Sequence, residues 1–303
     1  MNKRSAARTQ KQFDQIVAID WSGRIDVAGQ RRHIWAAAWS PAGVTLEAGR
    51  TRDQICDWLM EQAGHTPRTV VGMDFAFSYP AWFLREQGAG TALQFWKLVA
   101  AGQGEAWLHR ECGDARFWGK PKKKPLEFCG EYGHRMLRFT DVETKCVAEI
   151  TEAARAKRVS GIAPKSPFQI GGAGAVGTGS LRGIPYLLRL REGGYSIWPF
   201  DAPKLPTVLE IYPRLLTGPV NKGSADARRA YLTSKRRDDA RYRNLTGNVS
   251  AKAESSEDAF DALVSVMEMA ARQDELLALK PAANAQQRLE GCIWAPAGST
   301  AGR

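Results

Sequence analysis

The segment Thr69-Val-Val-Gly-Met-Asp74-Phe-Ala-Phe77 places a single carboxylate inside an apolar run. Its β-branched and aromatic residues, and its length, predict a strand that is buried on both faces. An ionised carboxylate taken out of water costs several kcal/mol unless a cation or a set of hydrogen-bond donors receives it. Asp74 therefore indicates a site that supplies such a partner, and we expect that partner to be a divalent metal ion.

Two other segments carry an acid in the same kind of setting. Asp20 ends the apolar run that begins at Gln15 and is followed by Trp-Ser-Gly, and Glu210 lies inside the short β-like run 207–213. Either acid has an ordinary alternative, because Asp20 can form a turn with its own backbone and Glu210 can point outward from an edge strand. Three acids in three separate strand-like segments favour a shared site.

Length and composition indicate a globular protein. The chain has 303 residues with 44% hydrophobic and 9% aromatic content, and it contains no apolar run long enough to cross a membrane. Five scattered cysteines do not form a disulfide pattern, which is typical of a reducing compartment. We therefore expect a cytoplasmic protein with a disordered basic tail at 1–12 and one domain at 13–297.

The charge of the chain indicates an anionic partner. Lys and Arg number 43 against 32 Asp and Glu, a net charge of +11, and part of the excess lies in two clusters. The candidate substrate-binding residues in these clusters are Lys120, Lys122, Lys123, Lys124, Arg236 and Arg237. Such clusters attract polyanions such as nucleic acid, although solvated loops or helix faces have the same composition.

The order of the expected elements defines the fold class. Strands are expected at 15–20, 32–39 and 44–47, a helix at 51–64, and then the strand that contains Asp74, which gives β-β-β-α-β. A large insertion at about 79–206, in which 141–157 is expected to be helical, precedes the strand around Glu210. A basic helical region is expected at 225–243, followed by a helix over 255–272 with Ser255 as its N-cap.

The last helix adds two acids. Asp258 and Asp261 are three residues apart, so they project from one face of a helix. Asp258 also suits the first turn for electrostatic reasons, and Asp261 also continues an ordinary polar face. Acids on two strands and one late helix can together hold Mg²⁺ or Mn²⁺, since these hard cations prefer oxygen ligands.

These motifs resemble a known superfamily. The β-β-β-α-β opening with Ala18-Ile-Asp20-Trp-Ser-Gly, the run Val71-Gly-Met-Asp74-Phe and the late Glu257-Asp-Ala-Phe-Asp261 are similar to the ribonuclease H-like superfamily. Together with Leu209-Glu210-Ile-Tyr-Pro and Glu290-Gly-Cys-Ile they more narrowly resemble the "domain of unknown function 429" family of predicted nucleases.

The resemblance implies an α/β fold with a mixed five-stranded sheet flanked by helices. The large insertion expected between the fourth and fifth core strands departs from small ribonucleases H, which leaves the choice of substrate open. It implies that Asp20, Asp74 and Asp261 bind the metal, and that Asp258 matches an extra helix acid of the resolvase branch. Glu210 has no counterpart among the usual ligands. It is therefore either a ligand particular to this family or a structural acid.

Two further patterns have weaker specificity. Gly172-Ala-Gly-Ala-Val-Gly177 matches GxGxxG, but no strand precedes it and no Walker lysine follows, so it is either a surface loop or a set of N–H donors for a phosphate. A second arrangement has the ligand types of a zinc site but no paired CxxC, and it consists of His109, Cys112, Cys129 and His134.

The sequence thus supports three hypotheses. The first is a Mg²⁺- or Mn²⁺-dependent nuclease with Asp20, Asp74 and Asp261 as metal ligands and with Glu210 and Asp258 as supporting acids. The second is an ATP-dependent phosphotransferase on the same superfold that uses the glycine-rich loop. The third is a nucleic-acid-binding module whose acids are structural. The choice between DNA and RNA stays open.

Overall fold

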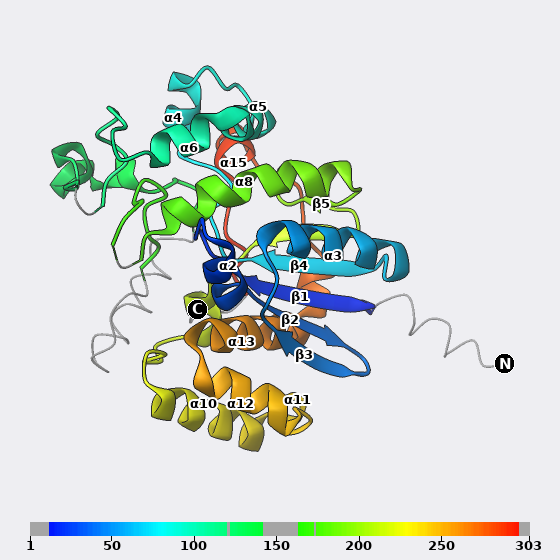
Figure 1. Cartoon of the computed structure of the whole chain (residues 1–303). Helices are drawn as coiled ribbons and strands as arrows, with labels where there is room; N and C mark the ends of the chain where they lie inside the picture. Colours follow the sequence, from blue (N-terminus) through cyan, green and yellow to red (C-terminus); the bar gives the residue numbers. More distant parts are fainter. Residues whose placement is uncertain (1–11, 120–121, 142–162, 173, 297–303) are drawn as a thin grey trace.

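The computed structural model describes residues 12–119, 122–141, 163–172 and 174–296. It is an α/β structure built on a mixed six-stranded sheet with the strand order β3-β2-β1-β4-β6-β5 (Figure 1). The strands are β1 (Gln15–Asp20), β2 (Trp35–Ser40), β3 (Gly43–Glu47), β4 (Thr69–Met73), β5 (Ser196–Ile197) and β6 (Thr207–Glu210). The predicted five-stranded sheet is wrong by one strand, because β5 adds a two-residue edge that is too short to be recognised in the sequence.

The pairing of the strands divides the sheet into two parts. The strands β1, β2 and β3 form an antiparallel meander, while β1, β4, β6 and β5 run parallel to one another. The carboxyl ends of parallel strands meet at the same edge of a sheet. The predicted strand acids are therefore brought to one edge.

Helices surround the sheet and fill the connections. The elements before β6 are α2 (Val27–His33), α3 (Arg52–His65), α4 (Ala81–Glu86), α5 (Ala92–Leu98), η1 (Val99–Gln103), α6 (Gly104–Leu108), η2 (Leu126–Phe128), η3 (Gly130–Met136) and α8 (Val176–Glu192). Those after β6 are α9 (Pro213–Thr217), α10 (Ala225–Asp238), α11 (Ala240–Arg243), α12 (Gly247–Ser255), α13 (Glu257–Ala271), α14 (Gln273–Leu277) and α15 (Ala285–Glu290).

The two faces of the sheet bury different sets of side chains. Ile16, Ala18 and Val70 belong to a core with α13, whereas Val17 and Val71 belong to a core with α3 and α8. In Figure 1, α13, α10 and α12 lie on one side of the sheet and α3 and α8 on the other. Alternate residues of each strand thus face opposite layers.

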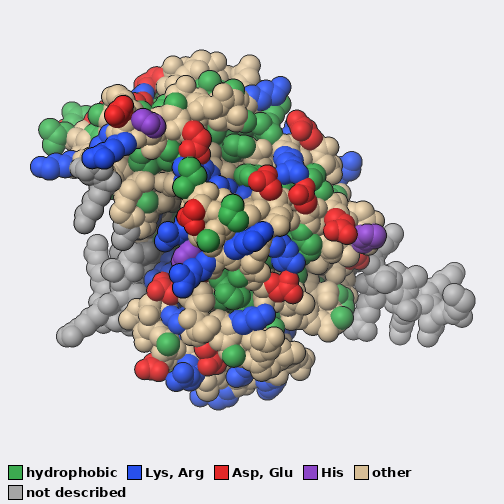
Figure 2. Space-filling model, viewed as in Figure 1, with side chains coloured by type: hydrophobic (Ala, Val, Ile, Leu, Met, Phe, Trp, Pro, Cys, Tyr) green, Lys and Arg blue, Asp and Glu red, His purple; other side chains and the backbone are tan. Residues whose placement is uncertain are grey.

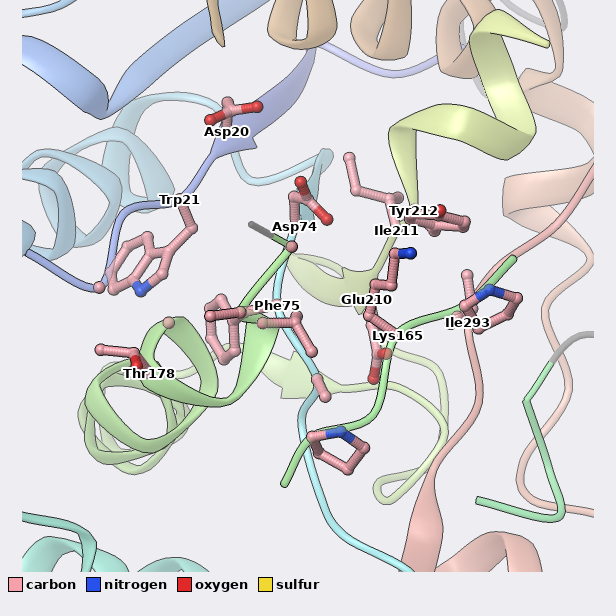
Figure 3. A pocket seen from close by; sticks show the side chains of 18 of the residues that line it. Asp20, Trp21, Asp74, Phe75, Lys165, Thr178, Glu210, Ile211, Tyr212 and Ile293 are labelled. Carbon is pink, nitrogen blue, oxygen red and sulfur yellow. The ribbon is translucent and has the colours of Figure 1, made fainter. Parts of the chain in front are cut away.

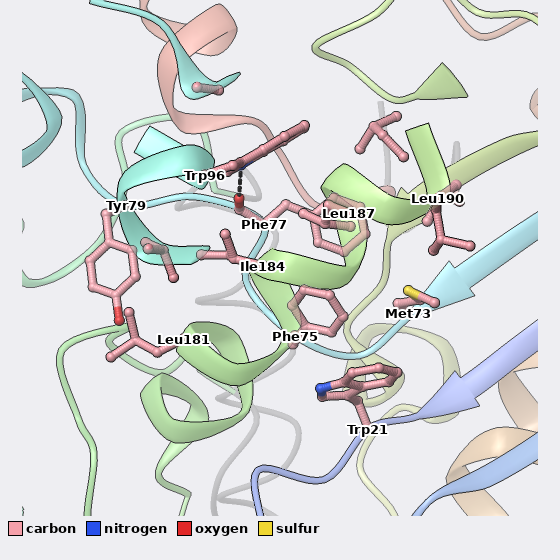
Figure 4. Packing of buried hydrophobic residues seen from close by; sticks show 14 of the residues in the cluster. Trp21, Met73, Phe75, Phe77, Tyr79, Trp96, Leu181, Ile184, Leu187 and Leu190 are labelled. Atoms are coloured by element: carbon pink, nitrogen blue, oxygen red, sulfur yellow. Dashed lines mark hydrogen bonds between the residues drawn. The ribbon is translucent and has the colours of Figure 1, made fainter. Parts of the chain in front are cut away.

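The face towards α8 continues into an aromatic core. Met73, Phe75 and Phe77 pack against the apolar side of α8, and the indole N–H of Trp96 donates to the carbonyl of Phe77 at 2.8 Å (Figure 4). This core extends into the segment between β4 and β6 through the rings of Tyr79, Phe83, Phe95, Phe117 and Phe168. The segment is therefore packed onto the sheet.

Two expected boundaries differ from the structure. Residues 27–33 form α2, so the second strand begins at Trp35 and not at Arg32; Asp26 caps this helix by accepting from Gly29 N at 2.5 Å. The helix α13 begins at Glu257 with Ser256 as its N-cap, and Ser255 ends α12. The basic tail up to residue 11 and the helix expected at 141–157, apart from residue 141, lie outside the described residues.

Candidate functional site

The strand acids Asp20 and Asp74 lie next to each other at the carboxyl edge of the sheet. Asp20 is the last residue of β1, and Asp74 directly follows β4. Ile19 pairs with Met73 in parallel register, and the backbone N–H of Asp74 donates to the carbonyl of Ile19 at 3.1 Å. The two acids therefore hold equivalent positions on neighbouring strands and project from the same face.

The face that carries them is the one covered by α13. Ala18 and Gly72, two residues before each acid, lie on this face, and a Cβ added to Gly72 would stand 2.8 Å from the Met269 sulfur of α13. The first turns of α13 consequently reach the sheet edge, where they bring Asp261. That side chain is 1% exposed. The structure thus brings together the three acids that the sequence predicted as metal ligands.

A lysine lies among these acids. The ammonium group of Lys222 donates to Oδ2 of Asp261 and interacts electrostatically with Asp20 and Asp74 as well. Oδ1 of Asp261 is buried and has no hydrogen-bond partner within the described ranges. One ammonium group therefore serves three carboxylates.

The raised pKa values of the three acids show that the cluster has too little positive charge. Burial, followed by repulsion from Asp261, raises the pKa of Asp74 to about 7. Burial and the neighbouring Asp74 carboxylate raise the pKa of Asp20 well above its usual range, and burial raises the pKa of Asp261 despite the opposing effect of Lys222. The cluster would accept additional positive charge, since each carboxylate disfavours ionisation of the others.

Glu210 lies on the other face of the sheet. It pairs with Met73 in the register of β4 and β6, so its side chain projects opposite to that of Asp74. Its carboxylate accepts from both Arg138 terminal nitrogens and, at 2.9 Å, from the Phe77 N–H. The same guanidinium lies 2.6 Å from Asp141, whose pKa burial raises to about 6. This geometry favours the structural role for Glu210, one of the two roles that the sequence left open.

Asp258 lies at the margin of the site. Its side chain is 32% exposed and contacts Nδ1 of His33 at 2.9 Å. This contact joins the start of α13 to the end of α2. Asp258 is therefore close to the other acids but has its own partner.

The carboxylate cluster opens into a cleft of about 740 Å³. Asp20 and Asp74 line it from the strand ends, and Trp21, Phe75 and Tyr212 provide aromatic walls (Figure 3). The glycine-rich segment and the start of α8 form another wall. Basic side chains that line the cleft are Arg24, Arg138, Lys165, Arg182 and Lys222. Opposite charges thus face one cavity.

The lysines predicted from the first basic cluster are not among the described lining residues of this cleft. Lys122 donates to the carbonyl of Cys112 at 2.6 Å, Lys123 is exposed, and Lys124 is partly buried. Lys120 lies outside the described residues.

The second basic cluster is largely paired within its own layer. Arg236 donates to the Ser250 hydroxyl, and Arg237 bonds Asp238 at 3.0 Å. Neither is a described lining residue of the cleft. Figure 2 shows basic and acidic side chains interspersed over the face seen in Figure 1. The cations closest to the acids come instead from Lys222 and from the cleft walls.

Sequence reasoning missed Lys222, Lys165 and Arg24. Each lies in a loop where no periodic pattern marks its orientation. The position of Arg24 could have been predicted in part, because it directly follows Asp20-Trp-Ser-Gly23 in the sequence and therefore lies near Asp20. Lys165 and Lys222 are brought to the cleft by tertiary structure alone.

The possible zinc arrangement has no support in the geometry of the described residues. No three His, Cys, Asp or Glu side chains in these ranges form a ready-made metal cage, and this includes the carboxylates of Asp20, Asp74 and Asp261. His109 Nδ1 accepts from the Glu111 N–H at 3.3 Å, and the Cys129 thiol is exposed. The His134 side chain lies outside what is described.

Comparisons with protein-family models, with curated proteins and with solved structures gave no match to this chain. Within the described ranges, no helix is both long and apolar enough to cross a membrane.

Proposed function

We propose that the chain is a divalent-metal-dependent nuclease of the ribonuclease H-like type. The observation that carries the proposal is the convergence of Asp20, Asp74 and Asp261 from two strands and one helix at the carboxyl edge of the sheet. Support for the fold assignment comes from the strand order β3-β2-β1-β4-β6, with the first three strands antiparallel and α3 leading into β4.

The chemistry of the donors, though not a pre-formed cage among the described residues, suits Mg²⁺ or Mn²⁺. All three candidate ligands are carboxylates, Asp261 Oδ1 has no described partner, and no described residue donates a hydrogen bond to the side chains of Asp20 and Asp74. A divalent ion bound there would stabilise charge on a phosphodiester and activate water for its hydrolysis. A metal would also relieve the repulsion that raises the pKa of these acids.

The other residues have distinct tasks in this proposal. Lys222 supplies one positive charge that offsets part of the repulsion among the acids. Beside this cluster, the contact between Asp258 and His33 joins α13 to α2. Glu210, whose side chain projects from the opposite face of the sheet, also lines the cleft, and its pair with Arg138 fixes the chain that follows β4. Among the cations that line the cleft, Arg24 and Lys165 form no ion pair with a described residue and could attract a phosphate backbone.

The test is cleavage of labelled single-stranded, duplex and branched DNA and RNA with Mg²⁺ or Mn²⁺. We expect metal-dependent cleavage by the wild type and its loss in Asp74→Asn, which keeps the shape of the side chain. Asp226→Asn is the matched control, because Asp226 is an exposed acid on α10 paired with Arg229. Equal cleavage by wild type and Asp74→Asn, or none on any substrate with unchanged metal affinity, would overturn the proposal.

A phosphotransferase is the second candidate. Its support is that the glycine-rich segment lines the same cleft as Asp20 and Asp74. It predicts metal-dependent turnover of ATP without strand cleavage, so the same samples distinguish it. Salt-sensitive nucleic-acid binding that metal does not change would instead indicate a non-catalytic binding module.

A further inference from the structure

The ammonium group of Lys222 lies among the three acids that we propose as metal ligands. It donates to Oδ2 of Asp261 and interacts electrostatically with Asp20 and Asp74. The side chain is 24% exposed and lines the cleft. The space between the three carboxylates is also the place where a single ion could contact all of them. An ammonium group and a divalent ion would repel each other strongly in that space, so the two cations compete for it.

A second lysine provides a comparison. Lys235 of α10 pairs with a buried acid of the same helix α13, Glu268, at 2.7 Å, and its side chain is 32% exposed. Glu268 is also paired with Arg272 at 2.5 Å, so this carboxylate has two cations. The Lys235 ammonium lies over two tyrosine rings as well, 5.4 and 5.7 Å from their centroids. Lys235 is therefore firmly held beside a neutralised acid, whereas Lys222 is shared by three acids.

Two arginines hold the backbone that carries Lys222. Arg228, which is 5% exposed, donates to the carbonyl of Lys222 and to a carbonyl near the end of α12. Arg214 donates to the carbonyl of Val220 in the same loop, and it also acts electrostatically on Asp261. Because the loop is fixed, the ammonium can leave the acids only by rotation of its flexible four-carbon stem. That stem is anchored in the wall of the cleft.

We propose that Lys222 is an exchangeable cation, which neutralises part of the charge on Asp20, Asp74 and Asp261 in the metal-free protein and turns into the cleft when a divalent ion binds. Lys222 is then a positioning residue for the ion. The released ammonium adds one positive charge to the cavity that an anionic substrate would enter. This inference rests on the metal site of the proposed function, but it does not require that the protein cleaves a strand.

The exchange has a quantitative consequence for metal binding. While the ammonium lies among the acids, the site does not hold an ion, so the apparent affinity is reduced by the fraction of molecules in which the lysine has left. The same fraction sets the rate at which an amine-reactive reagent modifies Lys222, because the paired ammonium is protected. Two separate measurements therefore report one equilibrium.

The first experiment is brief acetylation of the full-length protein with EDTA or with Mn²⁺, read at each lysine by peptide mass spectrometry. We expect Mn²⁺ to increase the modification of Lys222 roughly tenfold, as expected when a charged hydrogen bond is released. Lys235 is the matched control, because it is similarly exposed and paired with an acid of the same helix, and its modification should not change. Saturating Mn²⁺, verified by calorimetry, that leaves the modification of Lys222 unchanged would overturn the proposal.

Two variants measure the competition. Lys222→Met removes the competing charge, so its affinity for Mn²⁺ should exceed that of the wild type by at least the factor by which Mn²⁺ increases the acetylation of Lys222. Lys235→Met should bind Mn²⁺ as the wild type does. An affinity of Lys222→Met that equals or falls below that of the wild type would contradict the exchange. If Lys222→Met does not fold, acetylation of the wild type still decides the question.

The outcomes separate this proposal from the nuclease proposal. Exposure of Lys222 by Mn²⁺ without cleavage of any strand supports the exchange and removes the nuclease. Cleavage that needs Asp74, with Lys222 modified equally in the presence and absence of Mn²⁺, removes the exchange and leaves the nuclease. If neither the wild type nor Lys222→Met binds Mn²⁺, both proposals are wrong.

Discussion

Replacing Asp74 with asparagine should stabilise the metal-free protein at pH 8. In the folded chain the pKa of Asp74 is raised to about 7, from an ordinary value of 3.8, chiefly by burial and then by Asp261. Between these two values the folded state binds more protons than the unfolded state, so its stability falls as pH rises through this window. Above pH 7 the folded protein must hold an ionised Asp74, and the neutral amide removes that cost.

The magnitude follows from the two pKa values. Their difference corresponds to about 4 kcal/mol at about 1.4 kcal/mol per pKa unit, which is an upper limit. Asp74 borders the cleft and is partly exposed, so solvent screening reduces the gain to about 1–2 kcal/mol. For a chain of this size, this predicts a rise in Tm of roughly 2–6 °C.

The assay is thermal unfolding in EDTA between pH 4 and pH 8. We expect the difference between Asp74→Asn and wild type to be near zero at pH 4, to grow towards pH 7 and then to level off. Asp226→Asn should show no such pH dependence. A Tm for Asp74→Asn that equals or falls below wild type at pH 8, with the same dependence on pH, would refute the argument that the carboxylates are crowded.

The remaining predictions concern the groups that hold the site. Arg138→Leu removes the cation that pairs with the buried carboxylates of Asp141 and Glu210, so it should lower the free energy of unfolding in urea at pH 8 by about 3–5 kcal/mol. A loss below about 1 kcal/mol would contradict the burial of these carboxylates around one guanidinium. Lys222→Met should cost about 1–3 kcal/mol without metal, and Mg²⁺ should restore more stability to it than to wild type; equal responses would place the ion elsewhere. Gly177→Ala should cost about 1–3 kcal/mol, because its Cβ would stand 2.2 Å from the carbonyl oxygen of Pro167, whereas Gly179→Ala has room and should be neutral or stabilising. Thermal unfolding followed by circular dichroism measures the stability of both glycine variants.

Sequence alone could predict the sheet edge but not the orientation of every acid on it. The order of strands and the positions of Asp20 and Asp74 follow from apolar runs that end in carboxylates, and these positions agree with β1 and β4. Glu210 occurs in a similar run, yet its side chain projects from the other face. A strand buried on both faces is apolar throughout, so its pattern cannot show which face a given residue occupies.

Local signals also failed where polar residues form short helices. The segment of α2 contains Gly29 and three basic residues at its end, and its stability depends on the Asp26 cap and on tertiary contacts. Propensity is a weak guide in such a segment, because packing overrides it. The same limit explains why Lys222 could not be placed, since its position depends on contacts with α13.

The distribution of charge bears on the proposed nuclease function. A cluster of carboxylates repels a phosphate backbone, so a nuclease built on it needs positive charge close to the acids as well as a metal among them. Arg236 and Arg237 of the second cluster are already bonded to neighbours and are not described lining residues of the cleft. Lys165 and Arg24, in contrast, line the cleft itself and form no ion pair with a described residue. The attraction that brings a substrate to this site is therefore expected to come from the cleft wall rather than from the net charge of the chain.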